Sequence, residues 1–389
     1  MEKTEDNPMR HYIGLDISNK ETYICIVNQK GKVVRQMKAL SDPDDIGKAI
    51  KATGLEITLV GLETGALSHW ILEGLLKQGI QAKCICTRRM SAIIQTRVNK
   101  TDRNDAKEIA LAMKNENYRE VHQKSHNTIE IKVLMASRNA IVEKITDLKN
   151  TARGLLKLYG IKLKVGLKDE KYTEEVNAQL AWDQFLPEPR SKEGFEAIKI
   201  LMSCINSLIV ERTKLDQKLE GLCENDELIK KFDAIPGVGP ITILSYMTTI
   251  DDPTRFKYSR LVGAYLGLTP RQFSSGETIK QGKVSRCGSK QTRTLLVSAA
   301  KDIIESKKWS KLKAWGLKIA RKSGMRVAIH AVARKLAVIM HRMWINNSEF
   351  IFGEPKQKDL TETEKLEKLI KEAANKKKNK PKKETVKVA

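Results

Sequence analysis

Cysteines are few in this sequence, and their spacing suits neither a metal site nor a disulfide framework. The chain of 389 residues has six, with no C-x-x-C pair among them. They are Cys25, Cys84, Cys86, Cys204, Cys223 and Cys287. We therefore interpret them as ordinary reduced cysteines.

Long apolar runs are also missing. No stretch approaches the length that spans a bilayer, and the first residues, MEKTEDNPMRHYIGLD, lack the basic-then-apolar order of a signal peptide. The sequence predicts a cytoplasmic protein with no membrane partner.

Acidic residues are outnumbered: 47 Asp and Glu stand against 71 Lys and Arg, a formal net charge of +24. Such a charge attracts polyanions and releases counterions when phosphates are bound. Ribosomal proteins and proteins that bind anionic membranes are equally basic. The charge therefore indicates nucleic acid as the first partner to test, without indicating a reaction.

The N-terminal third has the pattern of an α/β domain. Three strand-like runs between His11 and Lys38 predict an antiparallel meander, and helical and strand patterns then alternate through ITLVGLE and IQAKCIC. We expect a mixed sheet with helices over residues 1–120.

Two long apolar seams follow, within residues 121–225. Their residues recur at spacings of mostly three or four, which is typical of a coiled coil. The first seam is Leu134, Ile141, Ile145, Leu148, Ala152, Leu155 and Tyr159, and the second is Ile198, Leu201, Ile205, Leu208, Leu215, Leu219 and Leu222. The helices could pair within one chain or between subunits, and residues 161–190 between them are expected to be a connector or small insertion.

Residues 226–352 have mainly helical patterns and begin with DAIPGVGPITILSYM. Pro-Gly-x-Gly between two helical stretches predicts a helix-hairpin-helix-like element, in which glycines let backbone amides approach a phosphate. Residues 353–389 are rich in lysine and are expected to be a disordered, basic tail.

Four carboxylates are the candidates for chemistry. Asp16 and Glu63 each end a predicted strand, and Asp102 and Asp105 lie three residues apart at a helix start. Helix capping or a strand-end turn explains each of these acids singly. Together they are suited to magnesium ions that assist in-line attack at a phosphodiester. Three basic residues interleaved with the aspartates are candidates for phosphate contacts, although a solvated helix face explains them equally well: Lys100, Arg103 and Lys107.

Five motifs, in this order, resemble bacterial insertion-sequence transposases that have a DEDD-type, RuvC-like catalytic domain and a serine-containing C-terminal domain, the family of bridge-RNA-guided recombinases. They are IGLD, LETGA, NKTDRNDAKEIA, AIPGVGPITI and GLTPRQFSSG. The resemblance extends from about His11 to about Leu296.

The resemblance implies an RNase H-like first domain whose acids Asp16, Glu63, Asp102 and Asp105 bind Mg²⁺. It also implies that Ser275, with Ser274 as the adjacent alternative, attacks DNA and forms a phosphoserine link. The implied partners are double-stranded donor and target DNA, a structured guide (bridge) RNA and other copies of the chain in a homotetramer, in the bacterial cytoplasm at the nucleoid.

A basic stretch follows the serine, and as a group four of its residues are expected to contact the DNA backbone: Lys283, Arg286, Lys290 and Arg293. Two other functions remain open. A metal-dependent junction endonuclease would use the acids with water, and a non-catalytic nucleic-acid scaffold would need only the charge and the coiled coil.

Overall fold

The computed structural model describes residues 10–87, 101–164, 166, 168–182, 192–224, 226–276, 278–355 and 357–378. The chain divides into two compact units, one ending at Lys124 and the other beginning at Ser125. Each unit is described by itself.

The N-terminal unit is built on a five-stranded sheet in the order β3-β2-β1-β4-β5. Its strands are β1 (His11–Ile17), β2 (Glu21–Asn28), β3 (Val33–Leu40), β4 (Ile57–Glu63) and β5 (Ala82–Ile85). The first three form an antiparallel meander, and β4 pairs in parallel with both β1 and β5. The predicted mixed α/β domain is therefore confirmed, and the sheet fits a RuvC-like arrangement.

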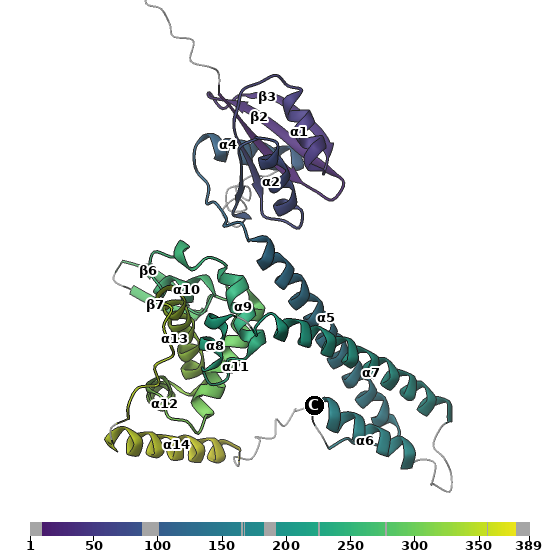
Figure 1. Cartoon of the computed structure of the whole chain (residues 1–389), viewed down its shortest axis with the longest axis vertical. Helices are drawn as coiled ribbons and strands as arrows, with labels where there is room; N and C mark the ends of the chain where they lie inside the picture. The colour runs from purple at the N-terminus through teal and green to yellow at the C-terminus, as the bar shows by residue number, and fades with distance from the viewer. Residues whose placement is uncertain are drawn as a thin grey trace, which may run out of the picture. The chain divides into compact units, whose positions relative to one another are not determined.

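Helices cover both faces of this sheet (Figure 1). They are α1 (Pro43–Lys51), α2 (Ser68–Lys77) and α4 (Asp102–Lys114). Alternate residues of a strand point to opposite faces. Ile13 and Leu15 of β1 accordingly pack in the core with α1 and α2, whereas Tyr12 packs with Ile109 and Met113 of α4. The even-numbered residues of β1 thus face α4.

The C-terminal unit begins with a helical arm made of α5 (His126–Leu158), α6 (Asp169–Trp182) and α7 (Lys192–Gly221). The two long helices, α5 and α7, pack side by side within one chain (Figure 1). Arg138 Nε lies 2.5 Å from Asp216 Oδ1 across this pair. The pairing left open by the sequence is therefore intramolecular in this structure, and the expected connector contains the helix α6, whose Tyr172 is fully buried against the pair.

The body of the C-terminal unit is mainly helical, as predicted. Its elements are α8 (Glu227–Asp233), α9 (Pro240–Ile250), the short 3-10 helix η2 (Pro253–Arg255), α10 (Arg260–Tyr265), the hairpin β6 (Pro270–Ser275) and β7 (Thr278–Val284), α11 (Lys290–Glu305), α12 (Lys311–Ser323) and α13 (Met325–Asn346). Tyr246 is fully buried in the core, where its hydroxyl donates to the Ala337 carbonyl oxygen at 2.8 Å. Burial raises the pKa of this phenol well above 10.0. Over the residues described, no helix is both long and apolar enough to cross a bilayer.

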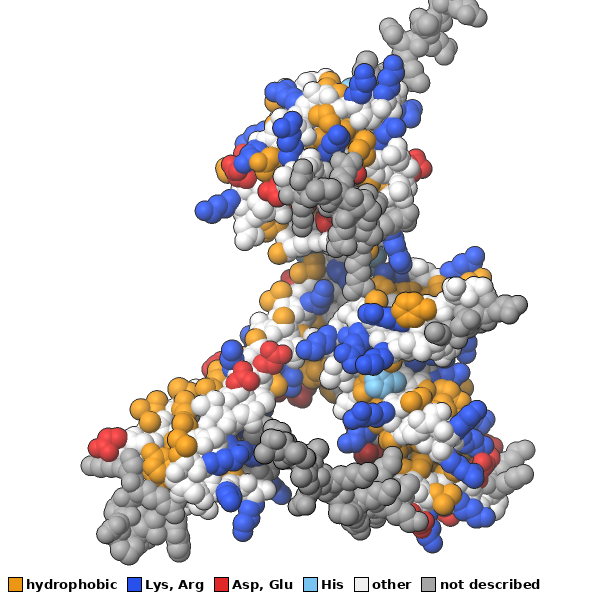
Figure 2. Space-filling view, turned by 180° about the vertical axis from the view of Figure 1, so that it is seen from behind, with side chains coloured by type: hydrophobic (Ala, Val, Ile, Leu, Met, Phe, Trp, Pro, Cys, Tyr) orange, Lys and Arg blue, Asp and Glu red, His pale blue; other side chains and the backbone are white. Residues whose placement is uncertain are grey.

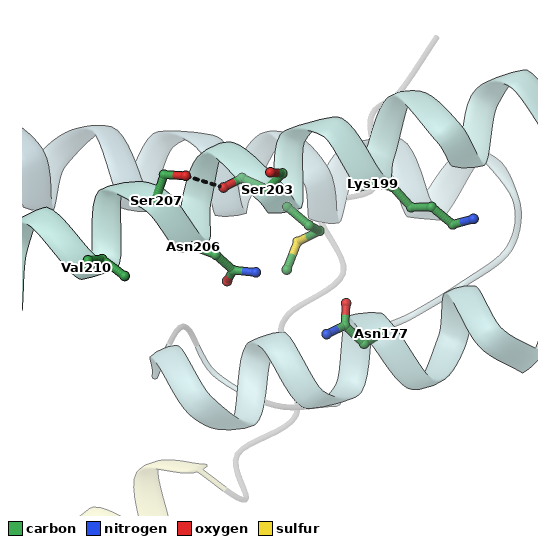
Figure 3. A pocket seen from close by; sticks show the side chains of 7 residues that line it. Asn177, Lys199, Ser203, Asn206, Ser207 and Val210 are labelled. Carbon is green, nitrogen blue, oxygen red and sulfur yellow. Dashed lines mark hydrogen bonds between the residues drawn. The ribbon is translucent and has the colours of Figure 1, made fainter.

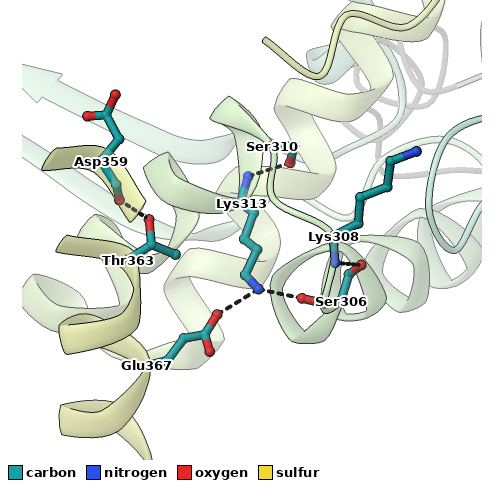
Figure 4. Close-up of polar contacts among 7 residues, drawn as sticks. All are labelled: Ser306, Lys308, Ser310, Lys313, Asp359, Thr363 and Glu367. Carbon is teal, nitrogen blue, oxygen red and sulfur yellow. Dashed lines mark hydrogen bonds and ion pairs between the residues drawn. The ribbon is translucent and has the colours of Figure 1, made fainter. Parts of the chain in front are cut away.

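The expectation of disorder from residue 353 onward is wrong for Gln357–Lys378, which form helix α14 against α12. Leu366 is 3% exposed, so apolar contact fixes a helix in which half of the residues are Lys or Glu. The buried Lys313 of α12 places its Nζ 2.6 Å from Glu367 Oε1 and also donates to the Ser306 carbonyl (Figure 4). The last residues of the expected tail, 379–389, lie outside the described residues.

Candidate functional site

Asp16 and Glu63 lie at the same end of two neighbouring parallel strands. Gly14 is the cross-strand partner of Gly61, and Leu15 is the partner of Leu62. Because side chains alternate along a strand, Asp16 shares a face with Gly14, and Glu63 shares that face with Gly61. Both acids therefore lie on the face covered by α4.

The two glycines let α4 approach this face closely. A Cβ atom at Gly14 would lie 2.0 Å from the Ala106 carbonyl oxygen, and one at Gly61 would lie 2.4 Å from Met113 Sδ. Gly14 thus faces the middle of α4, from Ala106 to Ala110, while Tyr12, farther from the end of β1 that bears Asp16, packs with Met113 in the last turn of the helix. The helix runs antiparallel to β1, so its first turn lies at the end of the sheet that bears Asp16.

Thr101, rather than an aspartate, caps α4. Its hydroxyl accepts a hydrogen bond from the Asn104 amide at 3.3 Å. Asp102 is consequently the first helical residue and is exposed, whereas Asp105 is 9% exposed. The negative charges of both carboxylates interact favourably with the positive, N-terminal end of the helix dipole. Side-chain capping, the alternative explanation for these acids, is supplied by a different residue.

Three carboxyl groups of this region have a solvent-shielded oxygen: Glu63, Asp105 and Glu108. Glu108 is 7% exposed and was not predicted as a site residue. Its spacing of three residues from Asp105 was the available signal, because that spacing keeps two helical side chains close.

The donors fit a hard divalent cation, since all four predicted ligands are carboxylates. Among the described residues, however, no three His, Cys, Asp or Glu side chains converge closely enough to hold a metal ion. Mutual repulsion of carboxylates favours separation when no cation neutralises them. The backbone thus brings the four acids to one end of one face, but their side chains do not form a complete metal centre.

The basic residues beside the acids differ in their surroundings. Arg103 Nε donates to Gln36 Oε1 of β3, and both residues line a hollow of about 410 Å³. Burial raises the pKa of the nearby Cys25 thiol, and the charges of Lys107 and Arg103 offset this rise only in part. Lys100 lies outside the described residues.

Ser275 is the last residue of β6 and is exposed near the tip of the β6–β7 hairpin, where it pairs with Thr278. Gly276 follows with φ +55, a backbone conformation that favours glycine in such a turn. The adjacent Ser274 is also exposed, and its hydroxyl accepts a hydrogen bond from Gln272 Nε2 at 3.1 Å. A large substrate can therefore reach either serine.

Three of the four predicted DNA-contacting basic residues line one hollow of about 870 Å³: Lys283, Arg286 and Arg293. Lys290, the first residue of α11, is not in its lining. Arg293 Nη1 donates to the carbonyl oxygens of Cys287 at 2.8 Å and Leu266 at 3.3 Å. Part of its guanidinium therefore holds the 285–288 loop in place.

The helix-hairpin-helix-like element consists of α8, a turn and α9. Gly237 has φ +76, and a Cβ there would lie 2.6 Å from Asp302 Cβ of α11. Packing on α11 therefore requires this glycine. Gly239 is the N-cap residue of α9, and nothing lies within 4 Å of its Cβ position, so a phosphate could approach the backbone there.

A further hollow, of about 430 Å³, lies on the helical arm between α6 and α7 (Figure 3). Its polar side chains are those of Asn177, Lys199, Ser203, Asn206 and Ser207. No carboxylate or histidine lines it in the part of the chain that the structure describes. Among the described residues it therefore offers no carboxylate ligand for a divalent cation.

An acid-bearing mixed sheet followed by a basic helical domain fits the class of DNA transposases, and the comparisons with known proteins support that class. Residues 13–161 match the DEDD transposase domain of the IS110 group, and residues 229–315 match the profile described as the IS116/IS110/IS902 transposase family. These segments contain the four acids and Ser275, respectively. The chain belongs to the IS110/IS116/IS902 family of transposases.

Individual relatives agree with this assignment. The transposase for insertion sequence element IS1111A of Coxiella burnetii is 28% identical over 337 residues, which cover 84% of this chain and 88% of the relative. A probable family 20 transposase of Pseudomonas aeruginosa is 25% identical over 84% of this chain and 95% of its own length.

Proposed function

We propose that this protein cuts and rejoins DNA strands of an insertion sequence, using Ser275 as the nucleophile and a magnesium site formed by Asp16, Glu63, Asp102 and Asp105. The observation that carries the proposal is the common placement of the acids. Asp16 and Glu63 lie at the ends of neighbouring parallel strands. Asp102 and Asp105 lie in the first turn of α4, the helix that covers the same face of the sheet. In this proposal the N-terminal unit has the RNase H-like, RuvC-like fold.

The proposed reaction exchanges one phosphoester for another. Ser275 Oγ attacks a DNA phosphorus, an Oγ–P bond forms and the bond from phosphorus to a deoxyribose oxygen breaks. The serine proton is released to solvent, and the departing oxygen takes up a proton to become a hydroxyl. Attack by the hydroxyl of a second DNA end on the phosphoserine reverses these steps and joins the strands without an external energy source.

The four carboxylates would hold the divalent ion through their oxygen atoms. Bound there, Mg²⁺ supplies Lewis-acid stabilisation of charge on the phosphoryl oxygens. Asp105 and Glu63, whose shielded oxygens are removed from competing water, are the best placed of the four to bind tightly.

The proposed substrates are double-stranded donor and target DNA, chosen through base pairing with a structured bridge RNA. Support comes from the net charge of +24 and from the basic surface of the C-terminal unit. Base pairing would provide sequence choice while the protein contacts backbone and shape. Because two DNA partners must be cut, we propose a homotetramer acting at the nucleoid in the cytoplasm.

A cleavage assay on end-labelled donor DNA, with bridge RNA present, tests the metal site. Asp105→Asn should abolish magnesium-dependent cleavage and leave DNA affinity unchanged, because it removes one charged ligand without altering the basic surface. Asp44→Asn, in the first turn of α1, is the matched control and should cleave normally. Equal cleavage by Asp105→Asn and wild type would contradict the assignment, and no cleavage by the wild type would favour a binding scaffold.

A further inference from the structure

Three adjoining hollows, linked by shared lining residues, form a segmented depression on the C-terminal unit. The hollow of about 870 Å³ between β7, α11, α12 and α13 shares Arg334 with a hollow of about 470 Å³. The latter shares Arg260 and Arg342 with a third, of about 530 Å³. We call this depression the basic track. It is defined by Lys283, Arg326, Arg334, Arg260, Arg342 and Lys257.

The basic track has no opposing charge along its lining. None of the described residues that line the three hollows is Asp or Glu. Lys and Arg side chains gather on the face of the C-terminal unit shown in Figure 2. An uninterrupted series of cations at the edge of a groove matches the repeated negative charge of a phosphodiester backbone.

One end of the basic track is apolar as well as basic. Trp315 of α12 is 39% exposed and Val327 of α13 is 52% exposed, and both line the largest hollow with Ile319 and Val297. Backbone contacts to a duplex would not require such a floor. A nucleobase turned out of its helix has an apolar face that stacks well on indole.

The track side chains are positioned by contacts of their own. The Arg334 stem lies over Gly263 of α10, where a Cβ would approach Arg334 Cγ to 2.8 Å. Arg260 lies 4.9 Å from the centre of the Tyr258 ring. His330 Nδ1 donates to the Arg326 carbonyl at 2.9 Å, which fixes the ring beside the apolar floor.

We propose that the basic track binds a single-stranded segment of nucleic acid, with an unpaired base against Trp315 and the adjoining phosphates along Arg334, Arg260 and Arg342. The inference rests on the proposed function insofar as it takes nucleic acid to be the substrate. It adds a site on α10, α12 and α13 for an unpaired strand.

Fluorescence anisotropy with the full-length protein tests the site, using labelled oligothymidylate and a labelled duplex of the same length as probes. Replacing Arg334 and Arg342 together by Gln should weaken oligothymidylate binding roughly tenfold. It should also reduce the slope of log affinity against log salt by about 1.4, since each single-strand phosphate contact contributes about 0.7. Arg321→Gln with Lys322→Gln is the matched control, because it removes the same charge from α12 outside the track.

Base stacking is tested separately at Trp315. Trp315→Ala should weaken oligothymidylate binding by roughly tenfold and duplex binding much less, while Trp315→Phe retains most of the affinity. Equal losses in the track double variant and its control, or equal effects of Trp315→Ala on both probes, would overturn the proposal. Ser275→Ala should bind oligothymidylate like the wild type. Oligothymidylate binding therefore tests the basic track even if Ser275 is not the nucleophile. Conversely, a negative result for the basic track does not bear on the reaction proposed for Ser275.

Discussion

Gly14 and Gly61 are direct partners on the parallel strands β1 and β4, and together they leave the space that α4 occupies. Asp16 and Glu63 follow each glycine by two residues and share its face. Asp105 comes one residue before Ala106, which lies against Gly14. The glycines therefore determine how near the helical acids come to the strand acids.

Gly14→Ala should destabilise the protein by about 3 kcal/mol, at the upper end of the range for overpacking, because the new methyl group would meet backbone atoms that cannot move away. It should also abolish cleavage by displacing the first turn of α4. Gly65→Ala is the control, since nothing lies within 4 Å of its Cβ position. Thermal unfolding followed by circular dichroism measures the difference, and equal midpoints for the two variants would contradict the close approach of α4.

Glu367→Gln should loosen α14. It leaves the ammonium group of Lys313, a residue only 4% exposed, without its carboxylate partner at 2.6 Å. Because Glu367 itself is partly exposed, we expect a loss of about 1–2 kcal/mol rather than the full effect of breaking a buried pair. Unfolding by urea measures the loss, and limited proteolysis should show earlier cutting within α14.

The control for this change is Glu362→Gln, which breaks the exposed pair with Lys318 on the same two helices. Exposed pairs contribute at most about 1 kcal/mol. Equal proteolysis of the two variants would show that Lys313 does not anchor α14.

Acid should destabilise the C-terminal unit through His341. Burial lowers the pKa of this imidazole from 6.5. One ring nitrogen lies 2.9 Å from the Pro253 carbonyl oxygen, a hydrogen bond that raises the pKa and offsets the effect of burial only in part, and the other lies 3.0 Å from Ser259 Oγ. The unfolded chain therefore binds the proton at a higher pH than the folded protein does. The contribution of His341 is complete above the unfolded pKa and is lost as pH falls through 6.5 toward the folded value.

Urea unfolding at a series of pH values checks this sign. The wild type should lose stability more steeply below about pH 6.5 than His341→Gln, which has no titrating ring. Parallel pH profiles for the two proteins would show that protonation of this residue does not affect folding.

Local patterns predicted much of the fold. A strand-like run predicted β1, a near-continuous apolar run predicted β4, and the heptad-like seams predicted α5 and α7. The acids could be found because each ends a strand or begins a helix. The close approach of α4 could not be found in this way, because it depends on Gly14 meeting a residue more than ninety positions away.

Composition was misleading where a few apolar residues determine packing. The stretch that forms α14 is dominated by Lys and Glu, yet Leu366 lies in the core with Ile370 packed against it. Of the residues that define the basic track, the sequence predicted only Lys283. Its cations come from α10 and α13 as well as β7, and only the tertiary fold brings Arg260 beside Arg334.

Formation of a protein–DNA link is the most direct test of the central claim. Purified protein, bridge RNA and end-labelled donor DNA are incubated with magnesium and separated on a denaturing gel. We predict a slowly migrating, protease-sensitive band that is present in wild type and Ser274→Ala but absent in Ser275→Ala and Asp102→Ala. Cleaved DNA without attached protein, persisting in Ser275→Ala, would contradict the claim and assign the attack to water.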